Sequence, residues 1–254
     1  MVGNTALLHL AVEIGCRLQE SGAETYRVEE AVRRIFQAYG ADSGQVFAIP
    51  NCLIVSVIDD DGRAISRLRR IPIHGTDISR MERVYDFCRQ ICSTTPDLDS
   101  ALEQLQTLDA KHPSFPVWFQ LLGYFVGAGA FALFWGGSGW DALAGGACGA
   151  AIGACLTVMA RLNANLFVKT AIAAFVSALM AMGLVAAGLG QHTNFITIGA
   201  LMALTPGIMF TNFMRDIMAG DTVAGLIKLV EALMTAGAIA IGTFVALAAA
   251  GLWR

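Results

Sequence analysis

The chain has few charged residues for its length. Charged side chains make up 15% of its 254 residues, against about 25% in soluble domains, and apolar residues make up 56%. The shortage is uneven, because residues 1–114 carry 28 of the 37 charged side chains and the remainder carries 20 of the 27 glycines. This pattern excludes a single soluble core. It predicts an α+β domain at residues 1–112 and a transmembrane domain at 113–254.

A concentrated basic surface is also missing. The formal net charge is −3 and the N-terminal part is acidic, so nucleic-acid binding is not expected. Arg63, Arg67, Arg69 and Arg70 form the single basic run. It is either the solvated side of a β-strand or a contact with anionic headgroups or an anionic solute.

Motifs of enzymes and metal sites are absent. The sequence has no GxSxG, HExxH or CxxC pattern, so we expect no enzyme activity, no metal and no cofactor. Four of the six cysteines lie in the N-terminal part without a pairing pattern, which favours a reducing compartment. No signal peptide is visible at the start. The N-terminal domain is therefore expected in the cytoplasm.

The N-terminal domain should contain helices and a small sheet. Apolar residues recur at three- and four-residue steps in 7–18, 28–39, 78–91 and 98–108, which predicts four helices. Residues 45–49, 52–58 and 64–71 read as strands. Ser21 and Glu24 form an S-x-x-E capping box before the second helix. A hinge is expected at 111–116, where two prolines cannot continue a helix.

Five apolar stretches are long enough to cross a bilayer as helices. They are residues 117–135, 140–160, 170–190, 194–214 and 223–253. Arg161, Lys169 and Arg215 lie in alternate loops, which predicts a cytoplasmic N-terminus and a C-terminus outside. The fold class is thus a five-helix membrane bundle preceded by a small α+β cytoplasmic domain.

Glycines repeat every fourth residue in the first two of these stretches, a pattern that lets helices pack closely. They are Gly123 and Gly127, then Gly145, Gly149 and Gly153. Five spans make a small bundle. We expect further helices from another copy or another chain.

The fourth stretch contains Pro206 and Gly207. Proline removes a backbone donor, so carbonyls near Met202 would lose their hydrogen-bond partners. This segment is either a broken helix that faces a transport cavity or a helix with a packing kink. Asn212, Arg215 and Asp216 follow at the cytoplasmic end. Arg215 either holds a substrate carboxylate or, with Asp216, marks the membrane interface.

Glu231 lies near the start of the last stretch, three residues after Lys228. Two interpretations stay open. Glu231 is either a desolvated carboxyl that takes up and releases a proton or the partner of Lys228 in an intrahelical pair.

Two segments resemble the threonine/serine exporter family of bacterial inner-membrane proteins. One is Gly22-Ala-Glu-Thr-Tyr-Arg-Val-Glu-Glu30, and the other runs from Thr205-Pro-Gly to Gly220-Asp221. We call them the first and the second motif. The matching positions are Gly22, Glu24, Arg27 and Glu29 in the first, and Pro206, Gly207, Asn212, Arg215, Asp216, Gly220 and Asp221 in the second. Arg27 and Glu29 are about 200° apart on a helix and could bridge to membrane loops or a partner.

The resemblance implies a function in transport. Full-length family members carry a second set of spans, whereas this chain ends at Arg254 and is similar to the split form, which works with a separate small membrane protein. That branch is associated with succinate export. The implied function is a subunit of a two-component inner-membrane exporter of threonine/serine-type amino acids or of dicarboxylates such as succinate. The alternatives are a membrane-anchored sensor or enzyme that acts through its N-terminal domain, and an assembly factor that scaffolds a partner.

Overall fold

The computed structural model describes residues 2–59, 61–71, 75–110, 115–162 and 164–251. The chain divides into two compact units. The first unit is Met1–Pro113 with Phe210–Leu229, and the second unit is Ser114–Met209 with Val230–Arg254. The expected boundary after residue 112 stays a prediction. Residues 111–114 of the expected hinge lie outside the described part.

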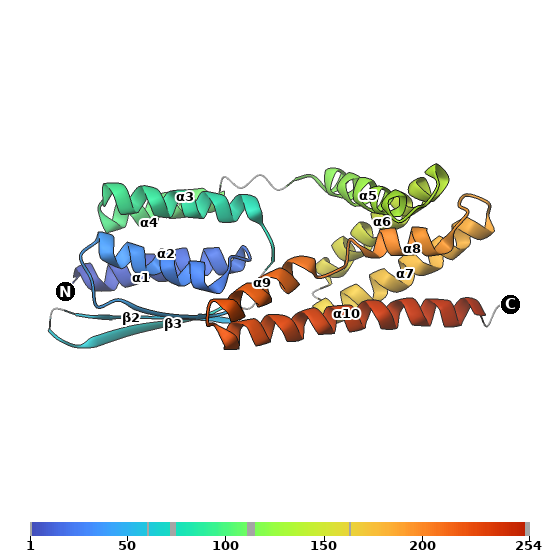
Figure 1. The fold of residues 1–254 in the computed structure, drawn as a ribbon. Coiled ribbons are helices and arrows are strands. Elements are labelled where there is room, and N and C mark those ends of the chain that lie inside the picture. Colours follow the sequence, from blue (N-terminus) through green and yellow to red (C-terminus); the bar gives the residue numbers. More distant parts are fainter. Residues whose placement is uncertain (1, 60, 72–74, 111–114, 163, 252–254) are drawn as a thin grey trace. The chain divides into compact units, whose positions relative to one another are not determined.

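The first unit has three layers. Helices α1 (Val2–Glu20) and α2 (Thr25–Ala38) pack between a small sheet and a pair formed by α3 (Ile78–Thr94) and α4 (Leu98–Ala110) (Figure 1). The hydrophobic core of this unit comes from all three layers and includes Leu10, Ile35, Leu53 and Ile91. Four helices and three strands were predicted here, and the structure confirms them.

The sheet is antiparallel, in the order β1 (Gln45–Ile49), β2 (Cys52–Ile58) and β3 (Ala64–Arg70). Its register places Phe47 opposite Ile54 and Ile54 opposite Leu68. Alternate residues of β1 and β2 are buried, because one face of the sheet packs on α1 and α2. The central strand β2 is the apolar, β-branched run that the sequence showed.

The capping box predicted at Ser21 and Glu24 is wrong. The Ser21 hydroxyl donates to the Arg17 carbonyl, and Glu24 is the N-cap of α2 without a side-chain cap bond. The segment instead ends α1 in a Schellman motif, in which the Gly22 amide donates to Gln19 and the Ala23 amide donates to Leu18. Gly22 has a φ of +84°, and a Cβ there would lie 2.5 Å from the Gly75 carbonyl oxygen. Its place in the first motif therefore has a backbone cause.

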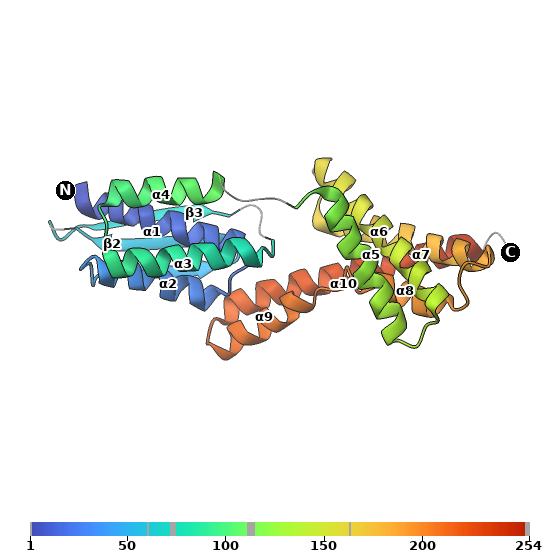
Figure 2. The same ribbon diagram turned by 90° about the horizontal axis from the view of Figure 1, so that it is seen from above.

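The second unit is helical. It contains α5 (Val117–Phe134), α6 (Gly139–Arg161), α7 (Leu166–Ala186), α8 (Thr193–Leu201) and most of α10 (Thr222–Gly251). Figure 2 shows α5, α6, α7 and α8 grouped in one bundle, and all four contact one another in adjacent pairs. Within the described residues, α5, α6, α7 and α10 are long and apolar enough to cross a membrane.

Close packing of α5 on α6 depends on the glycines of α6. A Cβ at Gly149 would lie 2.5 Å from the Tyr124 carbonyl oxygen, and one at Gly153 would lie 2.6 Å from the Tyr124 ring. Gly123 and Gly127 take no part in this contact, because no described residue lies within 4 Å of a Cβ at either position, and their role in close packing stays a prediction. The α6 glycines face α5, and the α5 repeat does not face α6.

The stretch 194–214 is not one helix. Helix α8 ends at Leu201 and α9 (Gly207–Met218) begins after Pro206, so the predicted break is present. Carbonyls near Met202 were expected to be unpaired, and this is wrong. The Met202 carbonyl accepts from the Thr205 amide, and the Leu201 carbonyl accepts from the Thr205 hydroxyl. A tight turn thus replaces the bonds that proline removes.

Candidate functional site

The two motifs meet in the first unit. Two consecutive residues at the start of α2, Glu24 and Thr25, bond to two consecutive residues of α9, Arg215 and Asp216. The residues that form these contacts are 191 positions apart in the sequence. We call Glu24, Thr25, Arg215, Asp216 and Lys228 the charge cluster.

Asp216 is the centre of the charge cluster. It is fully buried, and its Oδ2 accepts from Lys228 Nζ at 2.6 Å and from Thr25 Oγ1 at 3.4 Å. Lys228 Nζ also lies 3.4 Å from Thr25 Oγ1. The Lys228 side chain is 13% exposed, so this ion pair is largely removed from water. The loss of one partner of such a buried pair strongly destabilises the folded protein, because the other charge stays buried without a counter-charge.

One oxygen of the buried carboxylate has no partner among the described residues. Asp216 Oδ1 is buried and accepts no hydrogen bond. An unsatisfied acceptor beside a buried ion pair costs free energy that a hydrogen bond from a ligand donor would recover. The site therefore has room for one more hydrogen-bond donor.

Within the charge cluster, Glu24 makes the contact with Arg27, another residue of the first motif. Its Oε1 bonds to Arg215, and its Oε2 lies 2.5 Å from Arg27 Nε. Glu24 is 12% exposed, whereas both arginines are about half exposed. A hydrogen bond to the Tyr26 hydroxyl raises the pKa of Arg27. In this state Arg215, which was expected to hold a substrate carboxylate, is bound to a carboxylate of the protein.

Two further carboxyls of the motifs have shifted pKa values. Glu29 Oε1 accepts from the Ala48 amide at 3.0 Å, yet burial raises the Glu29 pKa above its ordinary 4.5. Burial, followed by the nearby charge of Asp216, raises the pKa of Asp221. Both shifts move the ionisation of these carboxyls to higher pH. The Glu29 carboxylate accepts from the Ala48 amide of β1 and from Arg33, which both belong to the first unit.

A tight turn between α9 and α10 brings Lys228 to Asp216. Gly220 has a φ of +97°, and the Asp221 amide donates to the Asp216 carbonyl in a second Schellman motif. The two helices then pack closely, because a Cβ at Gly225 would lie 2.6 Å from Ile217 Cγ1. Gly220 and Gly225 thus set the geometry of the cluster.

The other predicted site residues lie elsewhere. Asn212 is a half-buried residue of α9 in the first unit, whereas Pro206, Gly207 and Glu231 belong to the second unit. Glu231 is half-buried, and its carbonyl accepts from the Thr235 hydroxyl. The structure therefore joins Glu24 and Arg27 with Arg215 and Asp216.

Sequence reasoning missed the roles of Thr25 and Lys228. Thr25 lies inside the first motif, but it is uncharged and was therefore not selected as a candidate site residue. Lys228 was considered only with Glu231, because i,i+3 pairs are visible in a sequence. The signal that could have found it is a lone cation 12 residues after Asp216, across a glycine turn.

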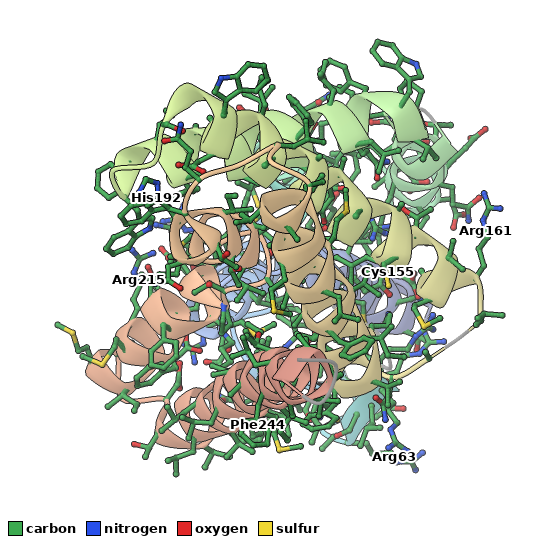
Figure 3. All side chains as sticks on the ribbon, turned by 90° about the vertical axis from the view of Figure 1, so that its right-hand side faces the viewer. Arg63, Cys155, Arg161, His192, Arg215 and Phe244 are labelled. Atoms are coloured by element: carbon green, nitrogen blue, oxygen red, sulfur yellow. The ribbon has the colours of Figure 1, made fainter. Side chains whose placement is uncertain are left out.

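A second buried carboxylate lies in the second unit. Asp141 is fully buried and completes the capping box of α6 with Ser138. It also accepts from the Gln191 and His192 amides and lies 3.0 Å from His192 Nδ1. Figure 3 shows the ring of His192 at the surface, and its side chain is 53% exposed. Among the described residues, no three His, Cys, Asp or Glu side chains form a group that could hold a metal.

Comparison with known proteins gives a consistent result. The profile of a family described as "Putative threonine/serine exporter" matches residues 9–250. The chain is 23% identical over 244 residues to a "Probable threonine/serine exporter" of Mycobacterium tuberculosis, covering 95% of this chain and 46% of that protein. It is 24% identical over 228 residues to "Pheromone-regulated membrane protein 10" of Pichia sorbitophila, covering 84% of this chain and 22% of that protein.

The chain thus spans less than half the length of these curated relatives. No solved structure matches it. The family profile nevertheless covers both motifs, the helices α2 and α9 that carry them, and the apolar helices α5, α6 and α7. On this match, the chain belongs to the threonine/serine exporter family.

Proposed function

We propose that the protein is a subunit of an exporter that moves small polar metabolites out of a bacterial cell across the inner membrane. The observation that carries this proposal is the family match over residues 9–250. Within the part of the chain that the structure describes, four helices are long and apolar enough to span a bilayer, which supports it. The M. tuberculosis relative is named for threonine and serine, which makes these hydroxy amino acids the first substrates to test.

The charge cluster supports an amino acid over a dicarboxylate. Arg215 holds the Glu24 carboxylate, and Asp216 holds the Lys228 ammonium. An amino acid carries both kinds of charge and can replace either internal partner. Succinate, the alternative substrate, can replace only Glu24, and it would be repelled by the buried carboxylate of Asp216.

The quaternary organisation is part of the proposal. The relatives are more than twice as long as the matched region. The proposed assembly adds further helices from a second small membrane protein or from additional copies. The N-terminal domain would be a cytoplasmic gate, with the C-terminus outside. Transport against a gradient needs an energy source, and we assign proton coupling to Glu231.

The direct test is efflux from loaded cells. Cells that express the protein, with and without the proposed second small membrane protein, are loaded with threonine, serine or succinate, and the medium is analysed over time. We expect faster release of threonine and serine only when both proteins are present. Equal release from cells lacking the protein would contradict export, and faster release of succinate alone would contradict the amino-acid assignment.

Coupling has its own test. Glu231→Gln should abolish the pH dependence of efflux while membrane insertion is unchanged, because the amide cannot bind and release a proton. Asp99→Gln, on an exposed face of α4, is the control. Unchanged pH dependence in Glu231→Gln would remove this residue from the mechanism.

A cleft in the first unit favours the second candidate, a sensor or enzyme. It has a volume of about 990 Å³, lies between α2 and α3, and is lined by residues that include Arg27, Arg34 and Tyr85. The buried Tyr85 hydroxyl has no partner among the described residues, and burial raises its pKa to about 12. If this candidate is correct, the full-length protein retains a metabolite in equilibrium dialysis, Tyr85→Phe does not, and the protein changes no efflux rate. Tyr39→Phe, outside the cleft, is the control.

A further inference from the structure

The cleft between α2 and α3 has the dimensions of a small-molecule site (Figure 1). Its volume of about 990 Å³ falls at the upper limit of the range of about 300–1,000 Å³ in which such ligands bind. Apolar and aromatic residues make up much of its lining, as in most ligand sites, and they include Ala31, Ile78, Met81 and Tyr85. The cleft lies within the first unit, and its lining among the described residues includes no member of the charge cluster.

Two hydrogen-bond donors of this cleft have no acceptor among the described residues. The Tyr85 hydroxyl is buried without a partner, and burial, which outweighs the nearby charge of Arg27, raises the pKa of Tyr85 to about 12. It therefore keeps its proton at neutral pH. Arg27 uses Nε both for its hydrogen bond to the Tyr26 hydroxyl and for its ion pair with Glu24, so its two terminal nitrogens donate to no described residue. Donors that lie close together without an acceptor favour a ligand that supplies acceptor oxygens.

The carboxylates around the cleft do not supply these acceptors. The charged residues of the lining are Arg27, Arg34, Arg89, Glu30 and Glu82. Glu30 accepts from Arg34, Arg89 bonds to Asp86 of its own helix, and Glu82 is exposed. Arg27 differs from the other two arginines, because its partner Glu24 is also bound by Arg215. One carboxylate thus serves two guanidinium groups, which leaves positive charge at Arg27 for an anion.

We propose that the cleft binds a small organic anion that regulates the exporter. A carboxylate or phosphate group of this ligand accepts from the terminal nitrogens of Arg27 and from the Tyr85 hydroxyl, and its apolar part packs on the apolar lining. Hydrogen bonds between a guanidinium and such an anion are about twice as strong as neutral ones. Regulation rests on the proposed function, whereas binding in the cleft does not.

Glu24 connects the cleft to the charge cluster. One of its carboxylate oxygens bonds to Arg215, and the other pairs with Arg27. An anion at Arg27 compensates the charge of that arginine, so Glu24 is held less by Arg27 and attracts Arg215 more strongly. A substrate carboxylate must then displace Glu24 from Arg215 against this stronger attraction, and the ligand should slow export. By linkage, a substrate at Arg215 returns Glu24 to Arg27 and weakens binding in the cleft by the same factor.

A native cysteine makes binding in the cleft measurable. Cys88 lines the cleft three residues after Tyr85, and because it is buried, a reagent has to enter the cleft to reach it. The full-length protein in detergent is treated with a polar thiosulfonate, and the modification rates of Cys88 and of Cys52, which lies on β2 outside the cleft, are measured by mass spectrometry. Benzoate, phenyl phosphate and the uncharged benzyl alcohol are the probes, because they share an aromatic ring and differ in head group.

We expect either anion, well above its Kd, to lower the ratio of the Cys88 rate to the Cys52 rate by about fivefold or more. Benzyl alcohol should leave the ratio unchanged. The anion that protects Cys88 at the lower concentration decides between a carboxylate and a phosphate as the natural head group.

Three variants separate anion recognition from folding. Arg27→Gln and Tyr85→Phe each remove one donor and should weaken the protection by about fivefold or more. Arg33→Gln removes the same charge from α2 outside the cleft and should leave the protection intact. Each variant is compared with its own rates without anion, which cancels direct effects of the lost charge on the Cys88 thiol. Arg27 is half exposed, so its variant tests recognition even where Tyr85→Phe lowers stability.

Threonine tests the link to the charge cluster. Threonine should weaken the protection of Cys88 by the anion in the wild-type protein, because both compete through Glu24. In proteoliposomes that contain the proposed second membrane protein, the protecting anion should slow threonine efflux. Arg27→Gln should remove this inhibition.

The proposal is overturned when neither anion protects Cys88, when benzyl alcohol protects it equally well, or when protection persists in both Arg27→Gln and Tyr85→Phe. Protection that threonine does not weaken, with an efflux rate that the anion does not change, contradicts the regulatory role. Protection in a protein that moves no threonine, serine or succinate under any condition would contradict the proposed function and still support the anion site.

Discussion

At the scale of single residues, the protein uses buried carboxylates whose charge is compensated by specific neighbours. Asp216 depends on Lys228 and Thr25, whereas Asp141 depends on backbone amides and His192. The two sites differ in one respect. Asp216 keeps one oxygen without a partner among the described residues, and Asp141 uses both of its oxygens. Asp216 is therefore the carboxylate with capacity for a ligand.

Removal of Lys228 should show how much the buried pair depends on its cation. Lys228→Met leaves Asp216 charged and unpaired in a buried site, which costs about 3–5 kcal/mol. We expect a large drop in the midpoint of thermal unfolding in detergent. The double variant Lys228→Met with Asp216→Asn should recover most of the loss, because no buried charge remains.

Lys169→Met is the matched control for this series. Lys169 also lies at the start of an apolar helix, α7, but outside the charge cluster. Its substitution should change the midpoint little. An equal loss in both lysine variants, or no recovery in the double variant, would contradict the assigned role of the pair.

The raised pKa of Glu29 predicts a pH dependence of stability. Its folded-state pKa lies above the ordinary 4.5, so its contribution is fully present below pH 4.5 and is lost as the pH rises through the raised value. Glu29→Gln should make the midpoint of thermal unfolding less dependent on pH between 4.5 and the raised pKa of Glu29. Glu30→Gln is the control, because Glu30 also pairs with an arginine four residues on but is 53% exposed, against 12% for Glu29. A flattening of the same size in both variants would exclude Glu29 as the cause.

At the scale of elements, glycines and one proline decide where helices end and how closely they pack. Pro206 separates α8 from α9, and Gly220 turns the chain from α9 into α10. Gly225 then lets α10 lie directly on α9. Without this close approach, Lys228 would not reach Asp216.

Alanine substitutions on α10 should separate close packing from helix propensity. Gly225→Ala places a Cβ 2.6 Å from Ile217 Cγ1 and 3.1 Å from the Phe213 carbonyl oxygen, so α9 must move. We expect a loss of about 1–3 kcal/mol, as for other overpacked sites. Gly237→Ala, on the same helix with nothing within 4 Å, should be neutral or stabilising. Thermal unfolding in detergent measures both, and equal effects would contradict the packing role.

At the scale of the whole molecule, the contacts of α9 bear on the number of membrane crossings. Among the described helices, four are long and apolar enough to span, and α8 and α9 are each too short. Asp216 nevertheless bonds to Thr25 of the N-terminal part, so we expect α9 on the same side of the membrane as that part. If α5, α6 and α7 each cross, the chain must return through the broken segment α8–α9. Five crossings, the number predicted from the sequence, stay a prediction.

Reporter fusions test this topology. Alkaline phosphatase fused to the C-terminus should be active, because five crossings place that end outside, and green fluorescent protein at the same position should be dark. A fusion within Gly188–Gln191 serves as the reference for the outer side. A fluorescent C-terminal fusion would mean four crossings. It would then contradict either the contact of Asp216 with Thr25 or the cytoplasmic position of the N-terminal domain.

Much of the architecture was predictable from local patterns. Apolar periodicity identified the helices and strands of the first unit, and long apolar runs identified α5, α6, α7 and α10. These features depend on residues close in the sequence, whose period directly reflects the geometry of a helix or a strand. The family resemblance and the break at Pro206 were visible for the same reason.

The site itself required the tertiary structure. Ser21 and Glu24 fit a capping box, but a left-handed Gly22 against Gly75 gave the segment another role. Thr25, Asp216 and Lys228 come from three elements, and no local period connects residues 191 positions apart. The amino-acid sequence alone therefore determined which segments are helical, which are apolar and which family they belong to. Only tertiary packing decided which charges are buried together, because burial and pairing depend on long-range contacts.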